Sequence, residues 1–297
     1  MSELTDCINN LSAKDIIRSV AKTANGVPFY LQTVGGGFCS EYQRIYDDLA
    51  GSGTPPGAAV AAAQNRMVCG WVDDGVWAKF DIFYLFAQTT NVGGEALMNW
   101  VSSGLYNATA FNAPVFTALE GFLGDSATTY IDTGWDPANN GVNFMQDSAS
   151  IGVYVRVNSL DGFDMGTADD VGHTNGIELV TRWGAGNSYI RNNTATSSSV
   201  GNADSRGLFI NNRVLSTHQD LYKNKIRTIN GAVASAGLTA SDLFCLAINI
   251  GGGATAQHTD RQLSMAFAGG GLTQTDIDNI TDRFEVYMDS NGKGVIP

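Results

Sequence analysis

The stretch "SIGVYVRVN", residues 150–158, alternates between two kinds of side chain. Branched aliphatic residues occupy every second position: Ile151, Val153, Val155 and Val157. Tyr154 and Arg156 lie between them and point to the opposite face, because successive side chains of a strand point to opposite faces. This period of two predicts a β-strand with one aliphatic face turned toward a core.

The same pattern continues on both sides of this strand. From residue 128 onward, short apolar or alternating runs recur at spacings of roughly ten residues and are separated by turn residues. The run "FDIFYLFA", residues 80–87, is almost wholly apolar and predicts a central strand that is buried on both faces. The chain contains 35 Gly, which suits many tight turns. We therefore predict a mainly β fold, a sandwich or jelly roll.

Helical signals occur at the two ends of the chain. Residues 11–24 and 40–50 carry apolar residues at helical spacing, and Thr273 with Asp276 forms a capping-box pattern before a C-terminal helix. The Gly-, Ser- and Pro-rich stretch at residues 51–57 separates the first part from the rest. We predict an N-terminal helical segment, 1–65, and a β-domain, 66–297. The segment either anchors the protein to a neighbouring subunit or forms a helical cap on the same domain.

Charge and composition restrict the partners. The formal net charge is −12, so the chain repels phosphate backbones and we expect no nucleic-acid partner. No apolar run is long enough to span a bilayer, and the N-terminus has no secretory signal pattern. We expect a soluble chain made in the cytoplasm. Its cysteines, Cys7, Cys39, Cys69 and Cys245, are far apart, and we expect free buried thiols.

Several acids stand in the stretch "GFLGDSATTYIDTGWDP", residues 121–137. Asp125 and Asp132 are placed where turn formers belong, at the two ends of a short strand whose core residue is Ile131. Retaining glycosidases place two carboxylates about 5–5.5 Å apart. The six Glu residues are scattered and form no such pair, and no nucleophile elbow or phosphate-binding loop occurs. We predict no catalytic residues and no enzyme activity.

One loop is rich in aspartate. The sequence "DGFDMGTADD" brings four acids between two predicted strands: Asp161, Asp164, Asp169 and Asp170. Calcium takes several oxygen ligands from such carboxylates and from backbone carbonyls. The spacing of an EF-hand is absent, and an acidic loop can equally be solvated. Calcium is thus a possible ligand of these four residues, and no other cofactor is expected.

Four aromatic residues are candidates for a ligand-binding surface: Trp135, Tyr154, Trp183 and Tyr189. They lie on predicted strands or in adjacent turns, and exposed aromatic rings can stack on sugar rings. Trp183 can alternatively fill the core between the sheets. Trp135 follows a turn glycine and precedes Asp-Pro, so we expect it to be partly exposed and to make an external contact.

Two sets of motifs resemble known families. "ALEGFLGDSATTYIDTG", "SASIGVYVRV" and the closing "LSMAFAGGGLTQTDIDNITDRFEVYM" resemble concanavalin A-like, laminin-G-like jelly rolls over residues 95–290. Together with "DDGVWAKFDIFYLFAQ", "SRGLFINNR" and "LYKN", their order resembles bacteriophage virion proteins that carry this jelly roll on tails, fibres or head decorations. Residues 1–65 resemble nothing that we can name.

The resemblance implies a non-enzymatic structural component of a phage particle. The N-terminal segment would bind other virion proteins, the protein would form a homo-oligomer such as a trimer, and the jelly roll would contact a host surface glycan. Its location would be the virion, without membrane insertion. The alternative is a carbohydrate-binding or depolymerising module that acts on the host envelope. A secreted cellular lectin is disfavoured, because the signal pattern is missing.

Overall fold

The computed structural model describes residues 20–22, 28–30, 37–253 and 255–297. The chain divides into two units, Met1–Cys39 and Ser40–Pro297. In the first unit, β1 (Val20–Lys22) pairs antiparallel with β2 (Pro28–Tyr30). The helix expected over residues 11–24 lies mostly outside the described residues. Its described part, Val20–Lys22, is extended, because its backbone pairs with β2.

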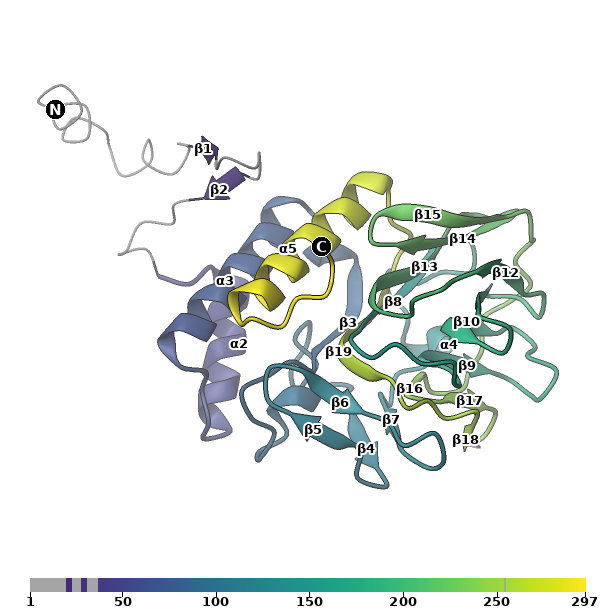
Figure 1. The fold of residues 1–297 in the computed structure, drawn as a ribbon, viewed down its shortest axis with the longest axis horizontal. Coiled ribbons are helices and arrows are strands. Elements are labelled where there is room, and N and C mark those ends of the chain that lie inside the picture. The colour runs from purple at the N-terminus through teal and green to yellow at the C-terminus, as the bar shows by residue number, and fades with distance from the viewer. Residues whose placement is uncertain (1–19, 23–27, 31–36, 254) are drawn as a thin grey trace, which may run out of the picture. The chain divides into compact units, whose positions relative to one another are not determined.

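The second unit is a β-sandwich with helices beside it (Figure 1). The sheet that we call sheet I has the strand order β15-β14-β13-β8-β19-β6-β5, and β3 also pairs with β19. Its strands are β15 (Ile226–Gly231), β14 (His218–Lys223), β13 (Gly207–Leu215), β8 (Ala149–Val155), β19 (Gln262–Gly269), β6 (Gly121–Leu123), β5 (Val115–Thr117) and β3 (Phe80–Leu85). The predicted strand around Ile151 is thus confirmed as β8, between β13 and β19.

Sheet II has the order β12-β11-β10-β9-β16-β7-β4, and the hairpin β17–β18 also pairs with β9. Its strands are β12 (Ser198–Gly201), β11 (Asn187–Asn192), β10 (Ile177–Trp183), β9 (Met165–Ala168), β16 (Phe244–Cys245), β7 (Tyr130–Asp132), β4 (Thr109–Phe111), β17 (Ile248–Ile250) and β18 (Thr255–Ala256). The strands pair antiparallel, except that β17 runs parallel to β9. The mainly β sandwich predicted from the sequence is confirmed.

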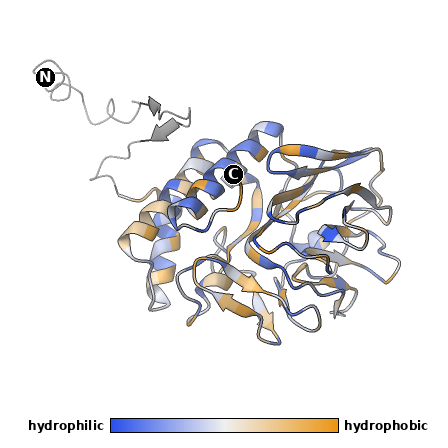
Figure 2. Cartoon of the chain, viewed as in Figure 1, coloured by the Kyte–Doolittle hydropathy of each residue, from blue (hydrophilic) through white to orange (hydrophobic). Residues whose placement is uncertain are grey.

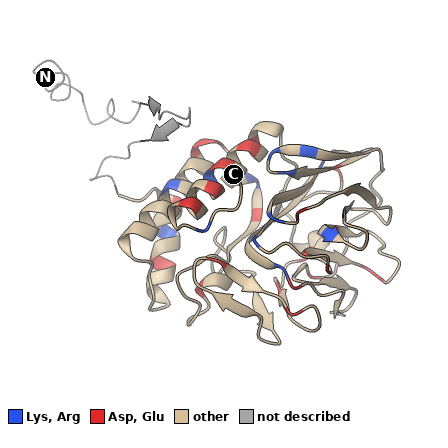
Figure 3. Cartoon of the chain, in the orientation of Figure 1, with Lys and Arg blue, Asp and Glu red and all other residues tan. Residues whose placement is uncertain are grey.

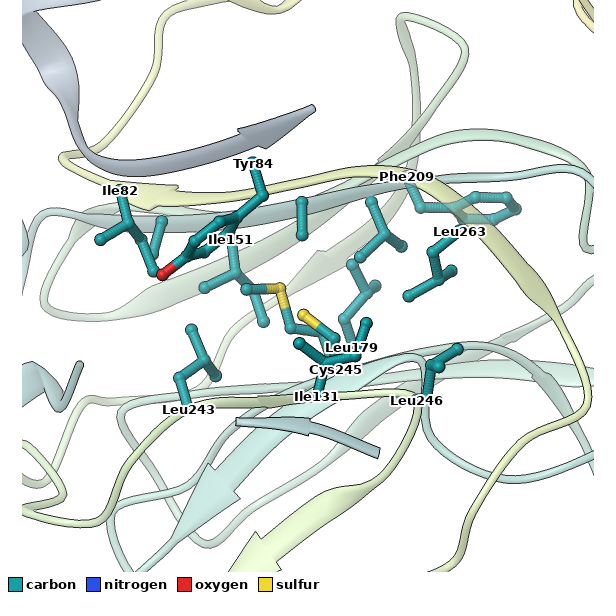
Figure 4. Packing of buried hydrophobic residues seen from close by; sticks show 14 of the residues in the cluster. Ile82, Tyr84, Ile131, Ile151, Leu179, Phe209, Leu243, Cys245, Leu246 and Leu263 are labelled. Atoms are coloured by element: carbon teal, nitrogen blue, oxygen red, sulfur yellow. The ribbon is translucent and has the colours of Figure 1, made fainter. Parts of the chain in front are cut away.

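The main core lies between the two sheets. Figure 4 shows side chains from sheet I, such as Ile151 and Phe209, facing side chains from sheet II, such as Ile131 and Leu179. All are buried. Burial of each such side chain stabilises the fold by about 1.5–3 kcal/mol. Because Ile177, Leu179 and Ile131 point inward, the residues next to them on β10 and β7 point to the outer face of sheet II.

Helices cover the outer face of sheet I. Helix α2 (Ser40–Gly51) packs on α3 (Ala58–Asp73), and α3 packs on α5 (Gln274–Ser290). Trp71 of α3 contacts Phe83 of β3, with ring centroids 5.2 Å apart. The strand β3 is buried, as predicted, and Figure 2 draws it in hydrophobic colours. It is not central, because β19 is its only strand partner among the described residues.

The C-terminal helix begins where the sequence predicts. Thr273 accepts a hydrogen bond from the backbone N–H of Asp276, and the Asp276 carboxylate accepts one from the backbone N–H of Thr273. This reciprocal capping box satisfies two donors that a helix start otherwise leaves unpaired. Figure 3 shows acidic residues along this helix, consistent with the acidic composition. Three shorter helices, η2 (Trp77–Lys79), η3 (Glu95–Leu97) and α4 (Pro137–Asn140), complete the described elements.

The expected boundary at residue 65 falls inside helix α3. The compact unit begins instead at Ser40, so α2 and α3 belong with the sandwich. Trp71, Tyr42 and Ile45 are buried, which explains why these helices do not separate from it. Residues 40–65 therefore belong to the same compact unit as the sandwich. The anchoring role of residues 1–65 stays a prediction, and residues 1–36 of this segment lie largely outside the described residues.

The cysteines differ from expectation. Cys39 and Cys69 are disulfide-bonded, and Cys245 is a free, buried thiol. Burial raises the pKa of the Cys245 thiol. Cys7 lies outside the described residues. The prediction of free thiols was therefore wrong for Cys39 and Cys69, since the spacing of cysteines along a sequence does not decide which of them are bonded.

No helix among the described residues is long and apolar enough to cross a membrane.

Candidate functional site

Two of the four aromatic candidates lie in the interior. Trp135 is fully buried and packs edge-on against Phe144, with ring centroids 5.4 Å apart. The positive φ of Gly134 and the capping of α4 by Asp136 turn the chain so that Trp135 points into the core. The expectation that Trp135 is exposed was wrong, and it cannot contact an external ligand from this position.

Tyr154 is also fully buried. It points away from the main core, toward helix α5, where its hydroxyl donates a hydrogen bond to Glu285 Oε2 at 2.5 Å. Its ring contacts Phe284 at a centroid distance of 4.9 Å. Burial raises the pKa of this phenol. Tyr154 therefore fixes the helix to sheet I and is not part of a ligand-binding surface.

The four aspartates of the predicted calcium loop do not converge. Asp164 is fully buried and forms an ion pair with Arg261, with Nε and Oδ1 2.6 Å apart. Asp170 accepts hydrogen bonds from its own loop at Gly172 and Thr174, and Asp169 accepts one from Asn175. Asp161 contributes its backbone carbonyl to Thr259.

Within the described part of the chain, no group of three or more His, Cys, Asp or Glu side chains is placed to hold a metal ion. Of the two alternatives, the geometry gives no support to a calcium site at Asp161, Asp164, Asp169 and Asp170. The side chains of Asp164, Asp169 and Asp170 are already engaged in turns and in one buried ion pair, so the four acids do not form a common ligand set.

The other two aromatic candidates lie together on the outer face of sheet II. Trp183 and Tyr189 are in edge-to-face contact at a centroid distance of 6.4 Å, and Trp183 is 37% exposed. They border a hollow of about 250 Å³. Its lining consists of Phe163, His173, Val180, Trp183, Tyr189, Arg191, Ser197 and Gln257. We call it the aromatic hollow.

Strand register explains how these side chains meet. Val180 of β10 lies opposite Tyr189 of β11, and Glu178 lies opposite Arg191. Their inward neighbours belong to the main core, so these four side chains point outward. The register shifts by one residue between Val180 and Trp183. This bulge places Trp183 on the outward face, which regular alternation would not do.

A second set of contacts completes the aromatic wall. Phe163 contacts Trp183 edge-on at 5.9 Å between ring centroids, and His173 stacks on the other side of Phe163 at 6.3 Å. His173 has a positive φ of 60°, which is uncommon for a residue other than glycine. Such backbone conformations are costly and cluster at binding sites. The His173 ring is thus held by a constrained loop.

The polar side of the hollow is built on one buried carboxylate. Glu178 is 1% exposed, and its Oε1 lies 2.5 Å from His173 Nδ1. Its other oxygen forms an ion pair with Arg191, whose Nε also donates to the carbonyl of Ala195. No hydrogen bond from Arg191 Nη2 occurs to any residue that the structure describes. This nitrogen therefore remains able to donate to a ligand in the hollow.

Sequence reasoning identified Trp183 and Tyr189 but missed the rest of this site. Glu178 and Arg191 carried an available signal, because each lies two residues from an outward-facing member of the same strand, Val180 or Tyr189. Phe163 and His173 lie in loops, and no local pattern places them beside these strands. Gln257 likewise reaches the hollow from a segment far along the chain.

The hollow has the chemistry of a binding site for a small polar molecule with apolar faces. Such sites combine aromatic walls with a few placed polar groups. Here the walls come from Phe163, Trp183 and Tyr189, and the polar groups come from Arg191, His173, Ser197 and Gln257. No Asp or Glu lines the hollow itself in the described chain, since Glu178 lies behind His173 and Arg191.

No protein-family model matches the chain, and no curated protein sequence matches it. Similar solved structures include domain 4 of AbnA, a GH43 extracellular arabinanase from Geobacillus stearothermophilus, in complex with arabinotriose. This comparison gives 15% identity over 68% of this chain and 98% of that chain, with a TM-score of 0.41.

Two further structures are similar at the same level. The botulinum neurotoxin serotype D binding domain is 12% identical, over 70% of this chain and 52% of that chain, with a TM-score of 0.43. A Trypanosoma rangeli sialidase in complex with sialic acid is 11% identical, over 72% of this chain and 33% of that chain, with a TM-score of 0.45. The chain thus spans about half of the first and a third of the second. Identities this low concern the fold alone.

Proposed function

We propose that this protein is a glycan-binding domain and that the aromatic hollow holds a neutral sugar unit. The observation that carries this proposal is the exposed Trp183 ring, which stands in a hollow beside Tyr189, Phe163 and Arg191. A large aromatic ring that is left partly in water, while its neighbours are ordered around it, marks a contact surface.

A sugar ring matches this surface in shape and polarity. Its C–H bonds form an apolar face, which packs on the negative face of an aromatic ring. Its hydroxyl groups lie at the rim and can both donate and accept hydrogen bonds. Arg191 Nη2 supplies donors there, while Ser197 and Gln257 supply both donors and acceptors. One ligand can therefore use the aromatic wall and the polar rim together.

The charge pattern favours a neutral sugar over an acidic one. Arg191 is the one Lys or Arg residue in the lining, and Glu178 already neutralises it. A carboxylated sugar would bring its charge close to the buried Glu178 carboxylate. The chain also carries a formal net charge of −12, which repels anions from a distance.

The residues that line the aromatic hollow favour binding of a glycan over its hydrolysis. Glycoside hydrolysis by the usual routes needs two carboxyl groups that flank the scissile bond. The described lining offers none, and Glu178 is engaged with His173 and Arg191. A measurement of reducing-sugar release from bound polysaccharide tests this part, and release that depends on Glu178 would contradict it.

The bonded state of Cys39 and Cys69 favours a role outside a reducing compartment, because disulfides persist in oxidising surroundings. A glycan-binding domain meets its ligand at such a place. The assignment to a phage particle, the virion location, the trimer and the contacts with other virion proteins stay predictions that rest on the motif resemblance.

The test is binding to an array of immobilised neutral and acidic glycans by the purified protein and by Trp183→Ala. We expect the wild-type protein to bind neutral glycans, and we expect Trp183→Ala to weaken binding by about thirtyfold or more, as for a central aromatic anchor. The variant should keep its stability to within about 1 kcal/mol, because Trp183 is partly exposed.

Ile226→Ala is the matched control, since Ile226 is an exposed apolar residue on sheet I. It should bind as the wild-type protein does. Addition of a chelator should change nothing. Equal binding by Trp183→Ala and the wild-type protein, or a preference for acidic glycans, would contradict the proposal.

A further inference from the structure

A second group of aromatic rings lies on the outer face of sheet II. Phe111 of β4, Tyr130 of β7 and Phe244 of β16 alternate with the core residues Ala110, Ile131 and Cys245, so they point away from the core. Phe111 and Tyr130 are cross-strand partners. We call these three residues the aromatic ladder.

The rings of the ladder are stacked along the sheet. Phe111 and Tyr130 are nearly parallel, with centroids 4.7 Å apart and an interplanar angle of 4°. Tyr130 and Phe244 are 4.8 Å apart, at an angle of 27°. Phe111 is 38% exposed, whereas Phe244 is buried at the inner end. The ladder is therefore open to solvent at Phe111 and closed at Phe244.

One short segment joins the ladder to the aromatic hollow. Gln257 lines the hollow, and its carbonyl accepts a hydrogen bond from Phe163 N–H at 2.8 Å. The next residue, His258, lies beside the ladder, with its ring 6.3 Å from that of Tyr130. His258 Nδ1 donates to the carbonyl of Thr129 at 3.0 Å, which leaves Nε2 available as an acceptor.

The separation of the two groups suits a chain of sugars. Strand β10, which carries part of the hollow, is three strand positions from β7, which carries Tyr130. Neighbouring strands are about 4.8 Å apart, so the two groups are about 14 Å apart along the sheet. A single sugar ring is too small to contact both, but an oligosaccharide can.

The acids beside the ladder select against anionic ligands. Burial raises the pKa of Asp132, and for Asp242 burial together with the neighbouring Asp132 and Asp136 has the same effect. These carboxylates are therefore short of positive partners, and an anionic sugar placed here would add to the repulsion. The hydroxyl groups of a neutral sugar can instead donate to them.

We propose that the aromatic ladder is a second subsite for the glycan held in the aromatic hollow, so that the ligand is a neutral oligosaccharide lying across sheet II. This inference rests on the proposed function and adds the length of the ligand to it. Phe111 and Tyr130 hold the distal sugar units, and the segment Gln257–His258 lies between the two subsites.

The test uses calorimetric titration of the full-length protein with linear neutral oligosaccharides of the cello, xylo, malto and arabino series, each from monosaccharide to hexasaccharide. In the series that binds, the affinity of the wild-type protein should rise with chain length. Phe111→Ala should bind the shortest ligands as the wild-type protein does and lose about tenfold in affinity for the longest. Tyr130→Ala should behave in the same way.

Val115→Ala, an exposed apolar residue on β5 of sheet I, is the control and should not change any affinity. If Phe111→Ala and Tyr130→Ala bind the longest ligands as tightly as the wild-type protein does, the inference fails, while a loss in Trp183→Ala still supports the proposed function. A loss that is equal for short and long ligands would also overturn it. If no neutral glycan binds the wild-type protein, the proposed function fails as well.

Discussion

Two carboxylate–guanidinium pairs of the same sandwich differ in how far their side chains are shielded from water. Asp164 and Arg261 have fully buried side chains, and the guanidinium also donates to the carbonyls of Gly162 and Arg182. Glu178 and Arg191 form the other pair, in which the Glu178 side chain is 2% exposed and the Arg191 side chain 18%. The first pair is enclosed on every side, and the second opens onto the aromatic hollow.

The difference teaches which pair can serve a ligand. A buried ion pair is tolerated when its polar atoms are satisfied within the protein. All three guanidinium nitrogens of Arg261 have partners, so the pair holds together the segments that carry Ser159, Gly162 and Arg182. Arg191 lines the hollow, and its Nη2 has no hydrogen-bond partner among the described residues. The same chemistry is structural in one place and available for recognition in the other.

The largest effect is expected at the closed pair. Arg261→Met leaves the Asp164 carboxylate buried without its cation, which should lower the free energy of unfolding by about 3–5 kcal/mol. Urea denaturation measures this change. The double variant Asp164→Leu with Arg261→Met should recover part of the loss, because an apolar replacement of both partners removes the unpaired charge. If Arg261→Met lowers the free energy of unfolding by less than about 1 kcal/mol, the Asp164–Arg261 pair is not the more structural of the two pairs.

A smaller effect on stability, joined to an effect on binding, is expected at the half-open pair. Glu178→Gln keeps the shape of the side chain but removes the charge that holds Arg191 and His173. We expect a loss of about 1–3 kcal/mol in the free energy of unfolding, since water can reach Arg191. Glycan affinity should fall as well, because Arg191 loses its fixed orientation.

The control for this variant is Glu120→Gln. Glu120 pairs with Arg156 and Lys293 and lies in the turn between β5 and β6 of sheet I, whereas the hollow is built on sheet II. The same substitution there should change stability without changing glycan affinity. If both variants bind equally well, Glu178 does not position the groups of the hollow.

The smallest effect on stability is expected at an ion pair that is partly exposed and has a long separation between its charged atoms. Asp220 has a side chain that is 10% exposed, and its partner Arg227 is 3.9 Å away. Burial raises the pKa of Asp220 in the folded protein. The folded state therefore holds the proton more tightly than the unfolded state does, and stability is lost as the pH rises from the unfolded pKa, about 3.9, through the folded pKa.

Asp220→Asn removes the loss of stability that accompanies ionisation of Asp220, because the amide does not ionise. We expect the free energy of unfolding at pH 7 to rise by less than about 1 kcal/mol, with no gain below about pH 3.9. Urea denaturation across pH 3–8 measures the difference between the variant and the wild-type protein. A gain that persists at pH 3 would show that the charge of Asp220 is not its cause.

The parts of the fold that could be predicted are those that local chemistry decides. The alternation around Ile151 and the capping box at Thr273 were read correctly, because each depends on residues a few positions apart. The acids of residues 121–137 also behave as predicted. The Asp125 carboxylate accepts hydrogen bonds from the N–H groups of Thr128 and Thr129, which lowers the pKa of Asp125.

The parts that could not be predicted depend on contacts between distant segments. Trp135 follows a turn, and its inward direction depends on the turn at Gly134 together with packing against Phe144, a residue of another segment. Trp183 lies on the outer face because of a one-residue bulge, and the alternating pattern of the sequence does not predict this bulge. The pairing of Asp164 with Arg261 likewise joins residues that are far apart along the chain.

The register of β10 with β11 has an evolutionary consequence. Inward positions such as Leu179 and Ile190 hold the core, while the outward positions Val180 and Tyr189 face the hollow. The two sets alternate codon by codon, so selection can act on each without disturbing the other. Under the proposed function, a lineage carrying this domain would exchange one ligand for another by substitutions at the outward codons, and the same codons are the ones to randomise in a library that seeks new specificities.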